Sequence, residues 1–326
     1  MKKDIMNNPI VLYHGNCWDG FCAAWLLRKV YPDAEFIPVQ YGQEPPESAE
    51  DKERPLFVVD FSYPRNVMFR LGAMRPGGMV VLDHHKTAQA ALDGLSEELT
   101  CNNCGSCEVV FDMNKSGARI TWEWIWRNHF GKKYSSLLNT ETGEVLYQDV
   151  APWLVNYTED RDLWRWKLPQ SKAITTCLRS HPLDFNLWDA FEKIDPKTLV
   201  NEGAAILRSE ATMIENHVRH AREIEMGGHK ILAVNATVLF SDIAGELAKD
   251  RPFGAAYFDR GDGKRQWSLR STDTGVDVSE IAKVHGGGGH RNAAGFEQIM
   301  DVIKGKHMSE ERHLLQRRIP GSWRRN

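Results

Sequence analysis

Short runs of β-branched and aromatic residues alternate with stretches of helical periodicity through the first 160 residues, and this alternation limits the chain to few folds. The expected strands cover residues 9–14, 34–41, 55–62, 78–85 and 107–113. Helices are expected over residues 20–30, 116–126 and 148–157, and Ser116 can cap the second of them. Strands separated by helices favour parallel pairing, with helices on both faces of the sheet. The sequence therefore predicts an α/β fold whose N-terminal domain is built on a parallel sheet.

The second half of the chain predicts a smaller α/β domain joined to the first by a long helix. Charged and apolar residues recur at helical period over residues 196–226, and Gly227 and Gly228 are expected to end this helix. Strands and helices then alternate up to a glycine run. We predict an N-terminal domain over residues 1–195, a linker helix over 196–226, a second domain over 227–300 and a basic tail over 301–326.

The charge balance bears on the class of partner. Lys and Arg number 41 and Asp and Glu number 44, giving a net charge of −3, so no global basic field favours stable binding of long nucleic acid. A small anionic substrate at a local site remains compatible with this balance. The apolar runs are far shorter than the roughly 20 residues of a membrane span, and the N-terminus lacks the apolar core of a signal peptide. The expectation is a soluble, cytoplasmic protein without a membrane partner.

Residue types that bind metals stand at the ends of three expected strands. His14 ends the first, Asp60 follows the third, and the triplet 83–85, Asp-His-His, ends the fourth. The carboxyl ends of parallel strands meet at one edge of a sheet, so these side chains should converge. Asp19, at the start of the first helix, can join them. Carboxylates mixed with imidazoles suit Mn²⁺ or a related divalent ion better than a thiolate zinc site.

These residues carry a resemblance to a known family. The chain resembles the DHH phosphoesterases with a C-terminal DHHA1 domain, which include RecJ-type exonucleases and oligoribonucleases. The resemblance covers nearly the whole chain up to about Phe296. Five motifs carry it in the family's order: His14 to Gly20, Val58 to Asp60, Val80 to His85, Tyr157 to Trp164 and Gly286 to Phe296.

The resemblance implies a site for two Mn²⁺ ions, with Mg²⁺ or Co²⁺ as substitutes. It places His14 and Asp19 on one ion, Asp60 between the two, and His84 with a late aspartate on the second. That aspartate is Asp162 or Asp160, and the local pattern favours Asp162. Asp83 would orient the histidines, and His85 would face the substrate, either to protonate the leaving oxygen or to stabilise the phosphorane-like transition state. Two such cations can activate water and neutralise charge on phosphorus.

The first motif departs from the family's pattern. Phe21 stands where a second aspartate would follow the glycine, which leaves one ion with one protein ligand fewer. Cys17, Asn16 or a water can take that place. This departure also keeps open a catalytically weakened protein that binds nucleotides without cleaving them.

The glycine run predicts close approach of backbone to a ligand. Four consecutive glycines before His290 are not expected in an ordinary strand or helix, because each costs backbone entropy. Their N–H groups, with a helix or turn at residues 292–294, would form an anion cradle. The resemblance implies that this loop and Arg270 hold the substrate. The expected binding residues are Gly287, Gly288, Gly289, His290, Asn292 and Arg270.

Two weaker patterns leave alternatives open. Cys101, Cys104 and Cys107 have zinc-like spacing but only three thiols, which fits either a metal role or a reduced loop. Trp164 and Trp166 alternate as in a strand and are expected in the core, although Trp164 is placed where it could stack on a base.

The sequence thus predicts a Mn²⁺-dependent phosphoesterase acting on short oligonucleotides or small nucleotides, with the long helix setting the width of a cleft that selects short substrates. A phosphatase of nucleotide bisphosphates, a single-strand exonuclease and the weakened binding protein are the alternatives. A homodimer is compatible with the sequence.

Overall fold

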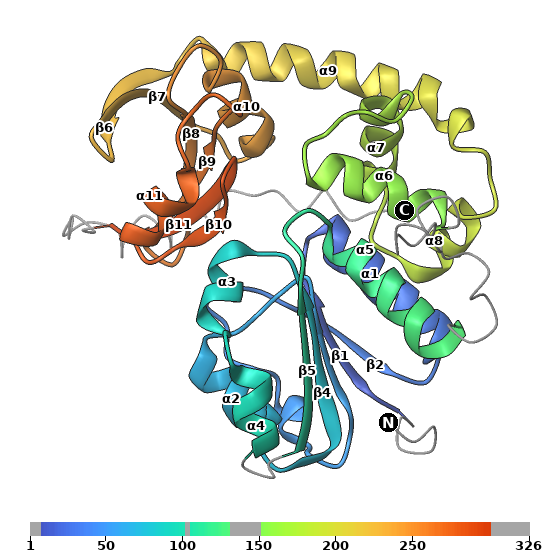
Figure 1. Ribbon diagram of the computed structural model, residues 1–326. Coiled ribbons are helices and arrows are strands. Elements are labelled where there is room, and N and C mark those ends of the chain that lie inside the picture. The colour runs from blue at the N-terminus through green and yellow to red at the C-terminus, as the bar shows by residue number, and fades with distance from the viewer. Residues whose placement is uncertain (1–7, 102–104, 131–150, 301–326) are drawn as a thin grey trace, which may run out of the picture.

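Five parallel strands form the centre of the N-terminal part in the computed structural model, which describes residues 8–101, 105–130 and 151–300. The strand order is β2-β1-β3-β4-β5, and every pairing is parallel, as predicted. The strands span β1 (Ile10–His14), β2 (Glu35–Val39), β3 (Leu56–Val59), β4 (Arg75–Asp83) and β5 (Gly105–Phe111). Figure 1 shows this sheet in the lower half of the molecule.

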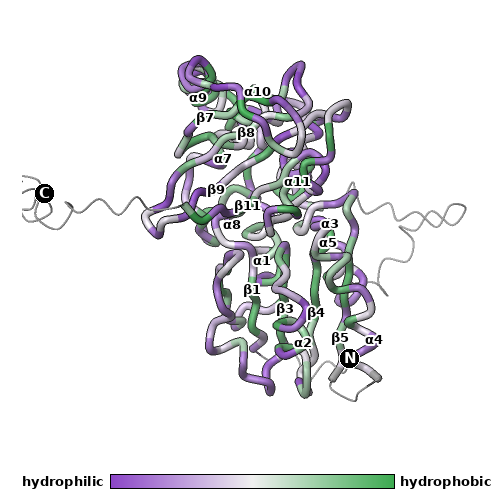
Figure 2. The backbone as a smooth tube through the Cα atoms, turned by 90° about the vertical axis from the view of Figure 1, so that its left-hand side faces the viewer, coloured by the Kyte–Doolittle hydropathy of each residue, from purple (hydrophilic) through white to green (hydrophobic). Residues whose placement is uncertain are grey.

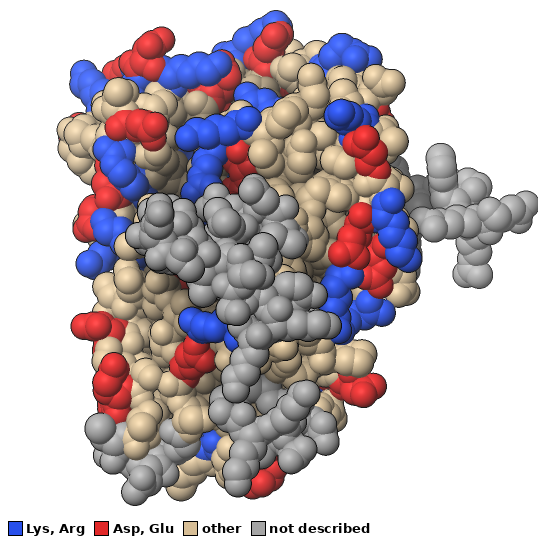
Figure 3. Space-filling model, turned by 45° about the vertical axis from the view of Figure 1, so that its right-hand side comes forward, with Lys and Arg blue, Asp and Glu red and all other residues tan. Residues whose placement is uncertain are grey.

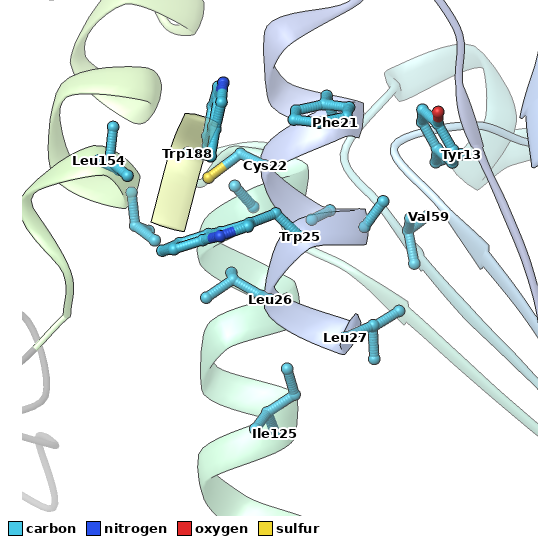
Figure 4. Close-up of a cluster of buried hydrophobic side chains, with 14 of the residues drawn as sticks. Tyr13, Phe21, Cys22, Trp25, Leu26, Leu27, Val59, Ile125, Leu154 and Trp188 are labelled. Atoms are coloured by element: carbon cyan, nitrogen blue, oxygen red, sulfur yellow. The ribbon is translucent and has the colours of Figure 1, made fainter. Parts of the chain in front are cut away.

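Two hydrophobic cores cover the two faces of this sheet, because its strands are apolar on both sides. One face packs against α1 (Trp18–Val30) and α5 (Gly117–Ile125), and the other against α2 (Arg65–Gly72) and α4 (Leu95–Cys101). Figure 2 shows the hydrophobic colour running along β1, β3 and β4. Figure 4 shows the first core, in which Trp25 of α1 and Trp188 lie between the helices.

Of the helices in this part, the third lies further along the chain than the sequence predicted. Ser116 caps α5 by accepting a hydrogen bond from the Arg119 N–H, as predicted. The third expected helix, placed at 148–157, instead forms α6 (Trp153–Asp162), and residues 148–150 lie outside the described ranges. Pro152 is the N-cap of α6, in agreement with the preference of proline for helix starts. Three further helices follow: α7 (Ser171–Arg179), α8 (Phe185–Phe191) and α9 (Val200–Val218).

The linker helix is shorter than the sequence predicted. It ends at Val218, and residues 222–226, which were expected to be helical, form strand β6 (Arg222–Met226). Gly227 and Gly228 have φ values of 57° and 77°, so they form the turn of a hairpin between β6 and β7 (His229–Asn235) rather than a helix end. In Figure 1, α9 runs along the top of the molecule between the two parts of the chain.

The second part is a six-stranded mixed sheet with the order β10-β11-β9-β8-β7-β6. Its further elements are α10 (Phe240–Leu247), β8 (Gly254–Asp259), β9 (Lys264–Arg270), α11 (Val278–Val284), β10 (Gly288–His290) and β11 (Ala293–Ile299). In Figure 1, β10 and β11 lie close to α3 (Lys86–Ala91), which follows β4. The second sheet therefore faces the carboxyl edge of the first.

The glycine run contradicts one expectation. Residues 288–290 form a short strand that pairs antiparallel with β11. Of the helix or turn expected at 292–294, Asn292 lies in the turn between the two strands, whereas Ala293 and Ala294 begin β11. Glycine is required because a Cβ on Gly287 would lie 2.1 Å from the Gly295 carbonyl oxygen. Close packing of two strands, rather than an irregular loop, thus explains this part of the run.

Trp164 and Trp166 do not lie in a strand. They have φ values of 57° and 53° in the segment that follows α6, and their rings meet edge to face with centroids 5.1 Å apart. Trp164 is 41% exposed, so it is not the core residue that the sequence predicted.

No helix within the described residues is long and apolar enough to cross a membrane. On the face shown in Figure 3, basic and acidic side chains are interspersed rather than segregated into one basic patch. The tail 301–326 and Cys104 lie outside the described residues.

Candidate metal centre

The ends of three parallel strands bring acidic and imidazole side chains to one place, as the sequence predicted. His14 ends β1, Asp60 follows β3, and Asp83 ends β4. Asp60 adopts a left-handed backbone conformation with φ of 53°, and its N–H donates to the Leu82 carbonyl. This turn keeps the Asp60 carboxylate at the edge of the sheet.

His84 stands at the centre of a buried carboxylate cluster. Its Nε2 lies 3.1 Å from Asp60 Oδ1 and 3.6 Å from Asp19 Oδ2. Asp162 Oδ2, from the last residue of α6, lies 3.6 Å from the same nitrogen. Asp19, Asp60 and His84 are each only 1% exposed. Four separate segments of the chain thus supply one compact set of ligand atoms.

Asp19 is held by the start of α5, which sequence reasoning did not connect to the site. Its two carboxylate oxygens accept hydrogen bonds from the N–H groups of Gly117 and Ala118, at 2.5 and 2.9 Å. A Cβ on Gly117 would lie 2.7 Å from the Asp60 Cβ, so only glycine permits this approach. The signal in the sequence was the glycine directly after the capping Ser116.

Asp83 orients the histidine pair, and its carboxylate lies within 4.8 Å of the ligand atoms of Asp60 and His85. Its Oδ1 accepts from the backbone N–H of His84 at 2.7 Å and lies 2.7 Å from His85 Nδ1. Its Oδ2 accepts from the Ser62 hydroxyl at 2.7 Å. Ser62 is a further supporting residue that the sequence pattern did not single out. With Nδ1 engaged, His85 keeps Nε2 for other contacts.

The structure separates the two candidate late aspartates. Asp162 faces the cluster, whereas Asp160 accepts hydrogen bonds from the N–H groups of Lys167 and Leu168 at 2.8 and 3.4 Å. Asp160 therefore orders the segment after α6, and the geometry favours Asp162 as a ligand.

Residues of the first motif take part in two groups of ligand atoms. Those of Asp19, Asp60 and His84 lie within 4.8 Å of one another, and so do those of His14, Cys17 and Asp60. The resemblance had paired Asp19 with His14, and here Asp19 lies beside His84 instead.

Phe21, at the position of the missing aspartate, is 2% exposed and stacks on Phe185 with centroids 4.7 Å apart. Figure 4 shows its ring among the core side chains.

The electrostatics of the cluster fit a divalent cation. Burial, followed by the charges of Asp60 and Asp162, raises the pKa of Asp19 well above its usual range. Burial also raises the pKa of Asp162. Burial acts in the same direction on Asp60, but hydrogen bonds from His14 and His84 outweigh it and hold its pKa well below its usual range. No lysine or arginine in the described part of the chain donates a hydrogen bond to these carboxylates. A bound cation would relieve this repulsion.

The second domain places His290 against the histidine pair. The His290 ring lies 4.5 Å from the ring of His84 and stacks on that of His85 at 4.7 Å with a 23° interplanar angle. Burial, with the neighbouring His85 and His84, lowers the pKa of His290 to about 2. A Cβ on Gly288 would lie 2.7 Å from Thr87 Oγ1 of α3, so glycine also permits the approach of the two domains.

Arg270 and Asn292 have different surroundings. Arg270 donates to Ser241 Oγ at 2.6 Å, while its buried Nε has no hydrogen-bond partner among the described residues. Burial lowers its pKa to about 10, and it is near enough to Asp162 for their charges to interact. Asn292 instead donates to Asp273 at 2.8 Å and accepts from Arg291. The structure thus brings Arg270, but not Asn292, towards the cluster.

Comparison with curated proteins finds two distant relatives. The chain is 27% identical over 326 residues to the uncharacterized protein R106 of Acanthamoeba polyphaga mimivirus, covering 90% of this chain and 69% of that protein. It is 26% identical over 283 residues to the oligoribonuclease NrnB of Bacillus subtilis, covering 82% of this chain and 64% of that protein, which is less than two thirds of its length. No family model matches the chain.

Solved structures with a similar chain path share little sequence with this protein. Exonuclease RecJ bound to manganese has a TM-score of 0.49 at 14% identity, covering 92% of this chain and 88% of that one. RecJ of Thermus thermophilus has a TM-score of 0.48 at 17% identity, covering 90% and 50% of the two chains. The pGpG-specific phosphodiesterase PggH of Vibrio cholerae has a TM-score of 0.40 at 13% identity, covering 95% and 98%.

Proposed function

We propose that this chain, whose resemblance to the DHH phosphoesterases is borne out by the oligoribonuclease among its relatives, is a divalent-metal-dependent phosphoesterase. Its proposed substrates are short oligonucleotides or small nucleotides. The observation that carries the proposal is the convergence of the buried Asp19, Asp60 and His84 with the more exposed Asp162. His85 and His290 lie beside this cluster. Acidic side chains gathered around an imidazole at a strand edge suit metal-assisted hydrolysis.

The two ligand groups would each bind one ion. His14 and Asp60 would hold one ion, and Asp19, Asp60, His84 and Asp162 the other, with Asp60 common to both. When bound, such ions activate water and neutralise charge on the phosphoryl group. Oxygen-rich ligation of the second group supports Mn²⁺, with Mg²⁺ or Co²⁺ as substitutes.

His85 is the proposed acid of the reaction. Asp83 accepts from the His85 Nδ1–H and stabilises the imidazolium form of the ring. In that form the proton on Nε2 can pass to the leaving oxygen. Burial opposes the protonated form, but the charge of Asp83 outweighs it and raises the pKa of His85 above its usual value. Asp83 thereby acts as a positioning residue.

The second domain supports a preference for short substrates. His290 stacks on His85, and Lys86, the next residue, pairs with Asp277 at 2.9 Å and Glu280 at 3.1 Å of the second domain. These contacts bring the second sheet onto the edge where the ligands lie. A long strand would require them to open, whereas a substrate of a few nucleotides fits a closed edge, with Arg270 available for its phosphate.

The test is a matched panel of substrates with Mn²⁺: a linear diadenylate, RNA and DNA oligomers of increasing length, 3′-phosphoadenosine 5′-phosphate and pyrophosphate. Wild type and Asp60→Ala are compared. We expect turnover only of short substrates and its loss in the variant, with the melting temperature showing that the variant is folded. Turnover of the bisphosphate alone would favour a nucleotide phosphatase, and turnover of long strands an exonuclease. No turnover with nucleotide binding retained would contradict the proposal and identify a binding protein.

A further inference from the structure

Cys17 lies inside the first ligand group, where the sequence pattern left its role open. Its Sγ donates to Asp60 Oδ2 at 3.1 Å. His14 Nδ1 lies 3.5 Å from the same oxygen, and the ligand atoms of the three residues are within 4.8 Å of one another. A nitrogen, a sulfur and an oxygen thus face one point from two strand ends and the start of α1.

The usual structural roles do not account for this thiol. Cys17 is the N-cap of α1, but its side chain makes no capping hydrogen bond. It is also partly exposed, unlike Cys22, which is fully buried in the core one turn further on. The hydrogen-bond acceptor of the Cys17 thiol is the Asp60 carboxylate, which both ligand groups share. The side chain is therefore directed at the metal centre and not at the core or the helix end.

The start of α1 supplies one side chain to each ligand group. Cys17 and Asp19 lie two residues apart there: Cys17 faces His14, and Asp19 faces His84. Each group then has a ligand from this turn, together with one histidine and Asp60. The missing aspartate at Phe21 leaves no vacancy in this arrangement, since the Phe21 ring lies in the core.

We propose that Cys17 is a ligand of the ion held by His14 and Asp60, and that this ion is therefore Co²⁺, Zn²⁺ or Fe²⁺ in preference to Mn²⁺. The inference rests on the proposed function, because it deepens the metal requirement of the same site. Thiolate ligands select softer cations, whereas the oxygen-rich group of Asp19, Asp60 and Asp162 suits Mn²⁺. On coordination the Cys17 sulfur binds the ion, and its proton is released to solvent. The two sites would then differ in the ion they prefer.

The experiment is Co²⁺ titration of the full chain, followed by near-ultraviolet absorption. A sulfur-to-cobalt charge-transfer band is expected in the wild type and absent from Cys17→Ser and Cys17→Asp. Cys107→Ser is the matched control, because Cys107 is likewise a free thiol but lies on β5 outside the ligand groups, and the band should persist in it. Cys17→Ser should weaken Co²⁺ binding by about 10- to 100-fold. Cys17→Asp should restore binding without the band and favour Mn²⁺ over Co²⁺.

Parallel assays of short-oligonucleotide hydrolysis separate this inference from the proposed function. If the wild type bound Co²⁺ without the charge-transfer band and still hydrolysed the substrate, Cys17 would not be a ligand. The proposed phosphoesterase function would be unaffected. Loss of the band in Cys107→Ser would also overturn it, because the sulfur ligand would lie elsewhere. A band without turnover would leave Cys17 as a ligand and contradict the function. Failure of the wild type to bind Co²⁺ would overturn the role of Cys17, whereas the phosphoesterase function would still be decided by turnover with Mn²⁺.

Discussion

Asp160 and Asp162 lie two positions apart on α6 and have different surroundings. Asp162 faces His84, and Asp160 accepts from the segment after the helix. Two residues apart on an α-helix means about 200° of rotation, so the two side chains leave the helix on opposite sides. A local pattern of acidic residues cannot reveal which side faces the metal, because that depends on how the helix packs.

We expect Asp162→Ala to impair ion binding and Asp160→Ala to impair stability. Asp162→Ala should weaken ion binding by about 10- to 100-fold, since a ligand facing the cluster is lost. Asp160→Ala should leave ion binding intact and lower the free energy of unfolding by about 1 kcal/mol, because the partly buried N–H groups of Lys167 and Leu168 lose their acceptor. Calorimetric titration with Mn²⁺ and thermal unfolding measure the two effects. Greater loss of ion affinity in Asp160→Ala would show that the aspartates are assigned the wrong way round.

His290 contributes to the site from the second domain. His290→Ala should raise the KM for a short oligonucleotide by about tenfold, the effect of losing a contact worth about 1–3 kcal/mol to a base or phosphate. His285→Ala is the control, because His285 belongs to the same domain but stacks on Phe296. Steady-state kinetics distinguish the two variants. If His290→Ala changed only the melting temperature, His290 would be structural.

At the scale of elements, glycines allow backbone segments to approach the metal centre. A Cβ on Gly20 would lie 2.6 Å from the His14 carbonyl oxygen, and one on Gly117 would meet Asp60. Helices α1 and α5 therefore begin directly against the strand ends, which places Asp19 under the N–H groups of α5. The sequence predicted these helices and the cap at Ser116, but it did not show that the two helices meet at Asp19. That contact joins residues about a hundred positions apart.

Gly288→Ala should disturb the contact between β10 and α3. The added methyl group would lie 2.7 Å from Thr87 Oγ1, so the strand must move away from the site, and the KM should rise by severalfold. Gly261→Ala is the control, because a Cβ there meets no atom within 4 Å. The double variant Thr87→Ala with Gly288→Ala should regain much of the lost affinity, since the clashing atoms are removed. An unchanged KM in Gly288→Ala would show that substrates do not depend on this approach.

At the scale of the whole molecule, the candidate metal centre lies where the second sheet meets the carboxyl edge of the first. The second sheet, joined to the first part through α9, faces the carboxyl ends of the parallel strands in Figure 1. Lys86 connects the domains through Asp277 and Glu280, one residue after His85. Closure of the domains and orientation of the proposed acid are therefore linked through adjacent residues.

Lys86→Met should reduce kcat/KM by severalfold and leave stability almost unchanged, since partly exposed ion pairs contribute only about 0–1 kcal/mol. Added salt should narrow the difference in kcat/KM between Lys86→Met and the wild type, because screening weakens the Lys86 ion pairs in the wild type. Lys249→Met is the control, since Lys249 pairs with Glu246 within the second domain. Small-angle scattering should show a more open Lys86→Met protein. An equal kcat/KM for the two variants would show that the Lys86 ion pairs do not contribute to domain closure.

The sequence by itself determined the parallel sheet and the convergence of His14, Asp60 and the 83–85 triplet, because strand periodicity is local and the ends of parallel strands must meet. Only the tertiary structure decided that Asp162 rather than Asp160 faces the cluster, that Phe21 enters the core while Cys17 faces Asp60, and that Gly288 lies against Thr87. These features depend on the direction of side chains and on contacts between distant segments. The packing of the whole chain determines the directions and the contacts, so no local sequence pattern can predict them.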